Sequence, residues 1–253
     1  MTSLESTPEF VSNVYATMHR NLEVVRRRLG RPLTLADKVL LGHLDDPENQ
    51  EMIPGTSYLH VRPDRVILQD VLGQSAMLQF MMTGRKKVAV PTTIHCDHLI
   101  EARVAGNLDL PASIAENNEV YDFLKSAAAK FGAGFWEPGA GIIHQVNLEN
   151  YAFPGAVILG TDSHTPNGGG IGACAVGVGG SAVSPATSAR WAGDYSYKAL
   201  TSWPDLSARL FPMKAKKSID HLLGMFAGLG AALLMCGCQP GDEAASEVTT
   251  SEG

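Results

Sequence analysis

Histidine and carboxylate side chains occur close together in two segments of the 253-residue chain. Asp97 directly precedes His98, and Asp162 lies two positions before His164. A carboxylate beside an imidazole fixes the tautomer of the ring and stabilises its protonated form, which makes the ring a good proton carrier near neutral pH. His144 lies between these segments, near the start of an expected helix. Two such pairs could manage a departing hydroxyl group, so these side chains are candidate catalytic groups.

The elements around these residues predict how they are positioned. Short β-branched runs alternate with apolar periodicities of helical spacing, and glycines such as Gly132 mark helix ends. This alternation indicates an α/β protein with a parallel sheet that has helices on both faces. Ligands of such sheets bind beyond the carboxyl ends of the strands, where we expect the histidines to meet. We expect strands at 65–70, 87–91 and 155–160, and helices at 11–29, from 34 onward, at 71–84, 113–132 and 142–152.

Other interpretations of the same residues remain open. An Asp or Ser after a strand is commonly a helix cap or a turn residue, and Gln69 could simply be satisfied at its strand end. The histidines and aspartates also suit a mononuclear zinc or non-haem iron site. The glycines at 168–170 are a poor phosphate loop, because no lysine follows them and no GxGxxG pattern is present.

Composition excludes several classes of protein. Apolar residues make up 45% of the chain, which is typical of a globular protein, and the net charge of -6 provides no basic surface for nucleic acid. Four cysteines at irregular spacings do not form a disulfide scaffold. Cys96 and Cys174 are therefore expected to be small buried apolar residues. The N-terminal residues do not have the pattern of a transit peptide.

Several segments together resemble the first part of the aconitase family, especially its mitochondrial type. They are "RPLTLADKVLLGHLDDPENQE", "RPDRVILQD", "KVAVPTTIHCDHLIEA", "GAGIIHQVNLENYA" and "LGTDSHTPNGGGIG", in the family's order, from about Glu9 to Gly180. The resemblance implies an aconitase-type α/β/α fold and interconversion of citrate and isocitrate through cis-aconitate, in the tricarboxylic acid cycle. It also implies a small tricarboxylate ligand, a monomer, and a mitochondrial location, with the cytoplasm as the alternative.

The resemblance also implies a role for each candidate residue around a 4Fe–4S cluster, whose open iron binds the substrate. Gln69 and Ser163 would bind substrate carboxylates. Asp97 and His98 would protonate the departing hydroxyl. Asn167 would lie in the outer shell of the cluster. The remaining candidates would surround the iron-bound water or hydroxyl and contribute to substrate binding: His144, Asp162 and His164.

The sequence also departs from the family pattern. The three cysteines that hold the family's cluster, its catalytic serine and its substrate-binding arginines are not in the printed sequence. We therefore expect the chain alone to bind no stable cluster and to be inactive. A non-catalytic aconitase-like binding or interaction module is the alternative.

The resemblance ends abruptly after Gly180. We therefore divide the chain into an aconitase-like region, 1–180, and a divergent tail, 181–253, which we expect to pack poorly. The tail contains an uncharged apolar run at 222–238, which is near the lower length limit for a membrane span. A packed helix or an out-of-frame translation is favoured over a membrane anchor.

Overall fold

A computed structural model describes residues 4–54, 57–180 and 183. The predicted tail at 181–253, including its apolar run at 222–238, lies outside the described residues except for Val183. Among the helices that are described, none has the length and apolar character needed to cross a membrane.

The centre of the fold is a parallel five-stranded sheet with the strand order β3-β2-β1-β4-β5. All five residues of the central strand β1 are buried, as expected for a strand covered on both faces. The predicted parallel α/β sheet is therefore confirmed. Its strands are β1 (Arg65–Gln69), β2 (Thr92–His95), β3 (Gly134–Trp136), β4 (Val157–Gly160) and β5 (Cys174–Gly177).

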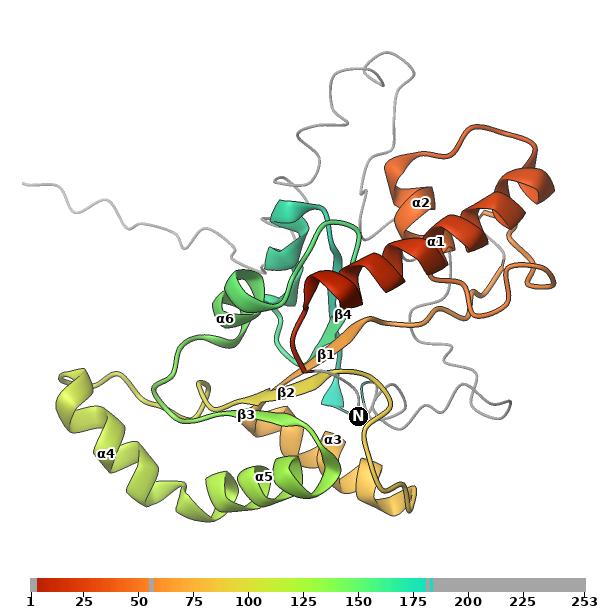
Figure 1. Ribbon diagram of the computed structural model, residues 1–253. Coiled ribbons are helices and arrows are strands. Elements are labelled where there is room, and N and C mark those ends of the chain that lie inside the picture. The colour runs from red at the N-terminus through yellow and green to blue at the C-terminus, as the bar shows by residue number, and fades with distance from the viewer. Residues whose placement is uncertain (1–3, 55–56, 181–182, 184–253) are drawn as a thin grey trace, which may run out of the picture.

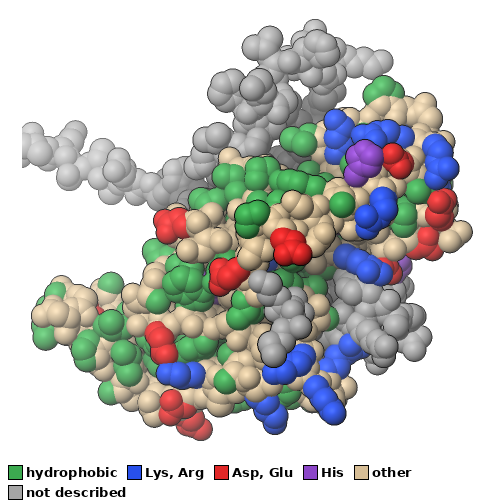
Figure 2. Space-filling view, viewed as in Figure 1, with side chains coloured by type: hydrophobic (Ala, Val, Ile, Leu, Met, Phe, Trp, Pro, Cys, Tyr) green, Lys and Arg blue, Asp and Glu red, His purple; other side chains and the backbone are tan. Residues whose placement is uncertain are grey.

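Helices cover both faces of this sheet (Figure 1). One face carries α3 (Asp70–Met82) and α5 (Asn118–Phe131), with α4 (Gly106–Glu116) beside α5. The other face carries α6 (Ile143–Asn150), the 3-10 helix η1 (Thr165–Ile171) and the first part of α1 (Pro8–Leu29). The second half of α1 packs against α2 (Leu35–Gly42), and basic side chains gather over this end of the molecule (Figure 2).

Two apolar clusters follow from the alternation of side chains along β1. Val66 and Leu68 point into the cluster beneath α3 and α5. In this cluster the rings of Phe80 and Phe131 pack edge to face, with their centroids 5.1 Å apart. Ile67 points into the opposite cluster, beneath α6 and α1. Burial on both faces makes β1 the rigid support for the loops at its carboxyl end.

The predicted strand at 87–91 is wrong, because the strand begins just after this segment, at Thr92. Val88 and Val90 are buried, which explains their apolar pattern, but they do not lie in the ladder. Pro91 has no backbone N–H to donate. Pairing therefore begins at its carbonyl, which accepts a 3.0 Å hydrogen bond from the Val66 amide.

The single helix predicted at 113–132 is also wrong, because α4 and α5 are separate helices that meet at Asn117. Ser113 lies inside α4 and does not cap a helix; its hydroxyl donates to the Leu99 carbonyl at 2.9 Å. The predicted end of the segment at Gly132 is confirmed, with a φ of 78° that suits glycine. The short strands β3 and β5 had not been predicted.

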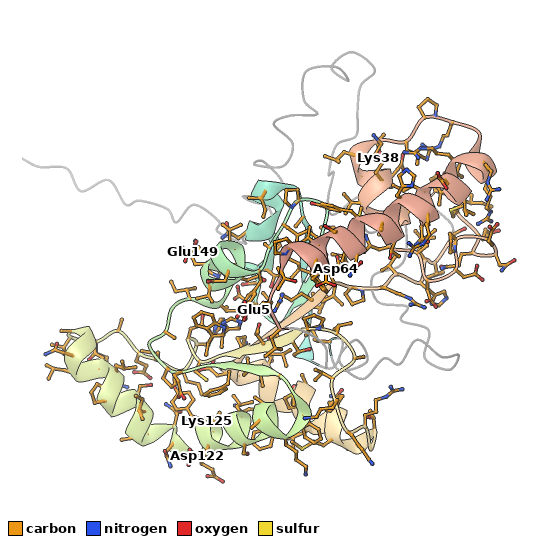
Figure 3. All side chains as sticks on the ribbon, in the orientation of Figure 1. Glu5, Lys38, Asp64, Asp122, Lys125 and Glu149 are labelled. Carbon is orange, nitrogen blue, oxygen red and sulfur yellow. The ribbon has the colours of Figure 1, made fainter. Side chains whose placement is uncertain are left out.

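A buried ion pair fixes the end of α2 to the sheet. His43 Nδ1 donates to the Val39 carbonyl at 2.7 Å, and His43 Nε2 donates to Asp64 Oδ2 at 2.8 Å. The same carboxylate oxygen accepts from the Val157 amide at 2.8 Å, so Asp64 joins the end of α2 to β4. Asp64 is labelled in Figure 3. Because both ring nitrogens face acceptors, this geometry favours the doubly protonated imidazolium.

We expect this pair to make the protein less stable as pH rises. Burial alone lowers the pKa of His43, but the hydrogen bonds to Asp64 and Val39 outweigh it, and the pKa is raised above its usual 6.5. The stabilisation is therefore complete below about pH 6.5 and is lost as pH rises through the folded-state pKa. Urea unfolding between pH about 6 and about 9 would measure this loss.

The matched variant for this measurement is His43→Gln, which removes the titrating group. Its free energy of unfolding should depend less on pH over the same interval. Equal pH dependence in both proteins would contradict the role assigned to His43.

Candidate functional site

The functional side chains lie where three adjacent strands end. Asp70 follows β1, Asp97 and His98 follow β2, and Asp162 follows β4. β1 lies between β2 and β4, so the parallel arrangement brings these three strand ends to one edge. The prediction that the candidate residues meet at this edge is supported by the hydrogen bonds described next.

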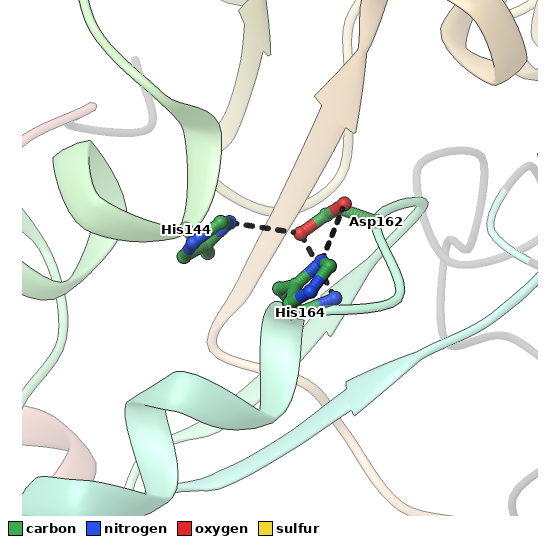
Figure 4. A group of neighbouring side chains, drawn as sticks. All are labelled: His144, Asp162 and His164. Carbon is green, nitrogen blue, oxygen red and sulfur yellow. Dashed lines mark hydrogen bonds and ion pairs between the residues drawn. The ribbon is translucent and has the colours of Figure 1, made fainter. Parts of the chain in front are cut away.

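Asp162 is the centre of the site. His98 Nε2 lies 3.1 Å from its Oδ1, and His144 Nδ1 lies 3.1 Å from its Oδ2. His164 Nδ1 is 3.7 Å from Oδ1, and the His164 amide donates to Oδ2 at 3.0 Å (Figure 4). Three histidines from different parts of the chain therefore surround one carboxylate.

Asp97 holds His98 from the opposite side. Asp97 Oδ1 is 2.9 Å from His98 Nδ1, while its Oδ2 accepts a 2.9 Å hydrogen bond from the Ile143 amide at the start of α6. The imidazole of His98 thus lies between two carboxylates, Asp97 and Asp162. Asp97 also fixes the first turn of α6, which carries His144.

These contacts shift the protonation equilibria of the site. The hydrogen bonds to Asp162 and Asp97 outweigh desolvation and raise the pKa of His98 to about 10. Burial alone raises the pKa of Asp162, but hydrogen bonds from His144 and His98 hold it well below its usual value. At neutral pH the site therefore contains a protonated His98 and an ionised Asp162.

The site is buried at its base and open at its rim. The side chain of Asp162 is 2% exposed, whereas those of His98 and His164 are 33% and 41% exposed. The His144 and His164 rings stack with centroids 5.0 Å apart (Figure 4). A ligand from solvent can therefore reach the imidazoles while the carboxylate stays shielded beneath them.

Gln69 does not contact the histidines. Its Oε1 accepts hydrogen bonds from the Val71 and Leu72 amides and caps α3. This is the structural role that was open as an alternative for this residue. Its side-chain nitrogen has no hydrogen-bond partner among the described residues, so it is available as a donor.

Ser163 and Asn167 follow Asp162 in the same loop and η1. Ser163 Oγ lies 3.2 Å from His164 Nδ1 at the exposed rim. Asn167 Nδ2 is buried and has no hydrogen-bond partner among the described residues. An orphaned buried donor of this kind is consistent with a group that is bound here and lies outside the described chain.

Sequence reasoning missed several residues that support the site. Asp70 accepts hydrogen bonds from the His98 and Leu99 amides, each at 3.1 Å, and so shapes the loop after β2. Thr161 Oγ1 accepts from the Gln69 amide at 2.8 Å. Asp70 directly follows β1 and Thr161 directly follows β4. A polar residue directly after a strand was therefore the sequence signal that could have identified both.

Comparison with known proteins identifies the family of the chain. The model of the aconitase family (aconitate hydratase) matches residues 37–190. The chain therefore belongs to the aconitase family.

The curated relatives are mitochondrial aconitate hydratases. The protein of Aspergillus fumigatus is 62% identical over 166 residues, which are 66% of this chain and 21% of that relative. The protein of Saccharomyces cerevisiae is 62% identical over 159 residues, 63% of this chain and 20% of the relative. The probable mitochondrial aconitate hydratase of Caenorhabditis elegans is 57% identical over 166 residues. The chain spans about a fifth of the length of these relatives.

Enzymes of the aconitase family generally carry a 4Fe–4S cluster, which thiolates hold. Within the part of the chain that the structure describes, the cysteines are Cys96 and Cys174. Burial raises the pKa of both thiols, that of Cys174 to about 11, which opposes formation of the thiolate. These two cysteines do not fit the cluster as its ligands. The described residues instead form one wall of a site, made of histidines and carboxylates. This histidine–carboxylate wall consists of Asp97, His98, His144, Asp162 and His164.

Proposed function

We propose that this chain is the N-terminal part of an aconitate hydratase that interconverts citrate and isocitrate through cis-aconitate. The observation that carries the proposal is the convergence of His98, His144 and His164 on Asp162, in a chain 62% identical to such an enzyme over 166 residues. Its substrate is then a small tricarboxylate, and its compartment is the mitochondrion.

Each group of the wall has a task in this reaction. Dehydration removes a hydroxyl, which leaves as water if it receives a proton. His98 carries that proton on Nε2, where it is now donated to Asp162, and Asp97 keeps the ring oriented. His144 and His164 lie beside the same carboxylate and would surround the departing oxygen.

The remaining candidates would bind the carboxylates of the substrate or lie near the cluster. The exposed Ser163 hydroxyl and the Gln69 side-chain nitrogen, which has no hydrogen-bond partner among the described residues, are donors suited to substrate carboxylates. Asn167, whose buried side-chain nitrogen has no partner within the described part of the chain, would lie in the outer shell of the cluster. The cluster ligands and the serine base would come from the remainder of a family enzyme, since the printed sequence does not contain those motifs. Residues 181–253 form a divergent tail in this proposal, and the protein acts as a monomer.

We expect the purified chain to form no cis-aconitate from citrate, because the wall supplies an acid but neither a Lewis acid nor a base for the carbon-bound proton. A mixture with a second polypeptide that supplies the remaining domains of a family enzyme, reconstituted anaerobically with iron and sulfide, should form cis-aconitate. Absorbance of the conjugated product measures both reactions. Activity of the chain alone would contradict the proposal. A mixture that assembles and remains inactive would favour a non-catalytic binding module.

A further inference from the structure

We propose that Asp70 is a positioning residue for His98, and that it acts by holding the backbone on both sides of the imidazole. The inference rests on the proposed function, in which His98 is the acid. The amide of His98 donates to Asp70 Oδ1, and the amide of Leu99 donates to Asp70 Oδ2, each at 3.1 Å. The peptide groups before and after His98 are therefore both fixed by one carboxylate.

The direction of this carboxylate is not explained by the helix that carries it. Asp70 is the first residue of α3, where an acidic side chain commonly faces the free amides of the first turn. Here that cap is Gln69, whose Oε1 accepts from the Val71 and Leu72 amides. Both oxygens of Asp70 instead accept from the loop after β2. The carboxylate thus supports that loop rather than α3.

Asp70 is also fully buried, so its position has an energetic cost. Its exposed fraction is 0%, and burial raises the pKa of its carboxyl group. A buried carboxylate needs hydrogen bonds to compensate for the loss of water, and the two loop amides provide them. The side chain and the loop therefore hold each other in one arrangement.

Ser113 fixes the same loop from α4. Its hydroxyl donates to the Leu99 carbonyl at 2.9 Å, and the residue is 5% exposed. Leu99 is therefore held at its N–H by Asp70 and at its C=O by Ser113. The hydrogen bond from Ser113 carries no charge, so its removal changes the support of the loop without changing the charge near His98.

The His98 ring needs this support because its two partners come from different parts of the sheet. Nδ1 lies 2.9 Å from Asp97, and Nε2 lies 3.1 Å from Asp162. The side chain is 33% exposed, so packing holds it only in part. Fixing the backbone of His98 fixes the direction of its side chain and keeps the ring within reach of both carboxylates. A displacement of about 1 Å near a catalytic group can lower a rate about 100-fold.

The first test uses the full chain alone and observes the His98 ring by NMR. Asp70→Asn keeps the shape of the side chain but replaces one acceptor oxygen with an NH2 group, which cannot accept from a backbone amide. We expect the signal of the hydrogen-bonded proton on Nε2 to be lost, and the pKa of His98 to shift from about 10 towards its ordinary range. The amides of His98 and Leu99 should also exchange faster with solvent.

A second variant separates position from charge. Asp70→Asn removes a negative charge as well as a hydrogen bond, and loss of the charge alone lowers the pKa of a nearby imidazolium. Ser113→Ala removes only a hydrogen bond to the loop. A smaller shift of the His98 pKa in the same direction in Ser113→Ala is the expected result.

Asp109→Asn is the matched control. Asp109 Oδ2 accepts from the Arg103 and Val104 amides, each at 2.8 Å, further along the same loop. The variant therefore weakens the same kind of contact at a distance from the acid. It should leave the ring signals of His98 unchanged.

The second test measures steady-state rates in the reconstituted enzyme. Asp70→Asn should lower kcat by about tenfold to 100-fold with little change in KM, and Asp109→Asn should retain the parent kcat. Asp70→Glu keeps the charge but moves the carboxylate by one methylene in a buried position, so it should not restore kcat. Circular dichroism confirms that each variant is folded, and Ser113→Ala provides the comparison if an Asp70 variant is not.

Unchanged ring signals of His98 in folded Asp70→Asn would overturn the proposal. An Asp70→Glu variant with the parent kcat would also overturn it, because the effect would then belong to charge alone. The NMR test needs no turnover, so failure of the two proposals can be told apart. An inactive mixture with altered His98 signals in Asp70→Asn would contradict only the hydratase function, whereas an active mixture with unchanged signals would remove only the positioning role.

Discussion

Substitution of His98 by alanine in the reconstituted enzyme is expected to lower kcat for citrate dehydration by about 10²–10⁴-fold, the usual contribution of a general acid. His98 is hydrogen-bonded to Asp162 and Asp97, which raise its pKa to about 10 and so keep it protonated at neutral pH. Alanine removes this proton source without filling its place. KM should change much less, because His98 acts on the departing hydroxyl rather than on the carboxylates that hold the substrate.

Steady-state rates of cis-aconitate formation measure this effect, with His19→Ala as the control for loss of an exposed histidine. Asp97→Asn should produce a smaller decrease, since it leaves the His98 ring in place and weakens one of the two hydrogen bonds that hold it. A decrease in kcat of less than about tenfold for His98→Ala would contradict its role as the acid.

Gly177→Ala should destabilise the protein and distort the site together. Gly177 lies on β5, and a Cβ atom at this position would lie 2.5 Å from the Asp162 carbonyl oxygen and 3.4 Å from Ser163 Cα. Both of these are backbone atoms, which cannot swing away as the end of a side chain can. We expect the free energy of unfolding to fall by about 1–3 kcal/mol or more, as overpacking usually does.

The displaced backbone carries Asp162, so the same variant should alter His98. Loss of the hydrogen bond between His98 Nε2 and Asp162 Oδ1 should shift the pKa of His98 from about 10 towards its ordinary range. NMR titration of the imidazole measures the pKa, and urea unfolding measures stability. Gly170→Ala is the control: no heavy atom of the described residues lies within 4 Å of its added Cβ, and stability should change by less than about 0.5 kcal/mol. Equal behaviour of the two variants would contradict the packing argument.

Much of the fold could be predicted because its signals are local. The helix at 11–29 has apolar spacing and a terminal glycine, and the structure confirms it as α1 with Gly30 at φ 59°. The strand at 87–91 failed because buried valines occur in loops as well as in strands. The break at Asn117 could not be predicted from the sequence, because helices lie directly on both sides of it. α4 ends at Glu116 and α5 begins at Asn118.

The site could be predicted as a set of residues but not as a geometry. The pair formed by Asp97 and His98 is encoded by adjacent positions, and the structure contains it. That His98 also reaches Asp162, 64 positions away, depends on the order of strands in the sheet. Gln69 shows the opposite case: a structural role at the strand end was an open alternative for it from the sequence, and its side-chain oxygen Oε1 caps α3.

The strand order has a consequence for the sequence of events during synthesis. β1, β2 and β3 leave the ribosome before β4, yet β4 pairs with β1 on the side away from β2. The segment between β1 and β4, which contains β2 and β3, must close into a long loop before β4 can pair with β1. Closing it costs chain entropy before any contact compensates, so this pairing is intrinsically slow. The hydrogen bond between His98 and Asp162 therefore cannot form until β4 joins the sheet. A nascent chain released before that step would have a three-stranded sheet with an exposed edge, and its imidazole would lack one of its two carboxylates.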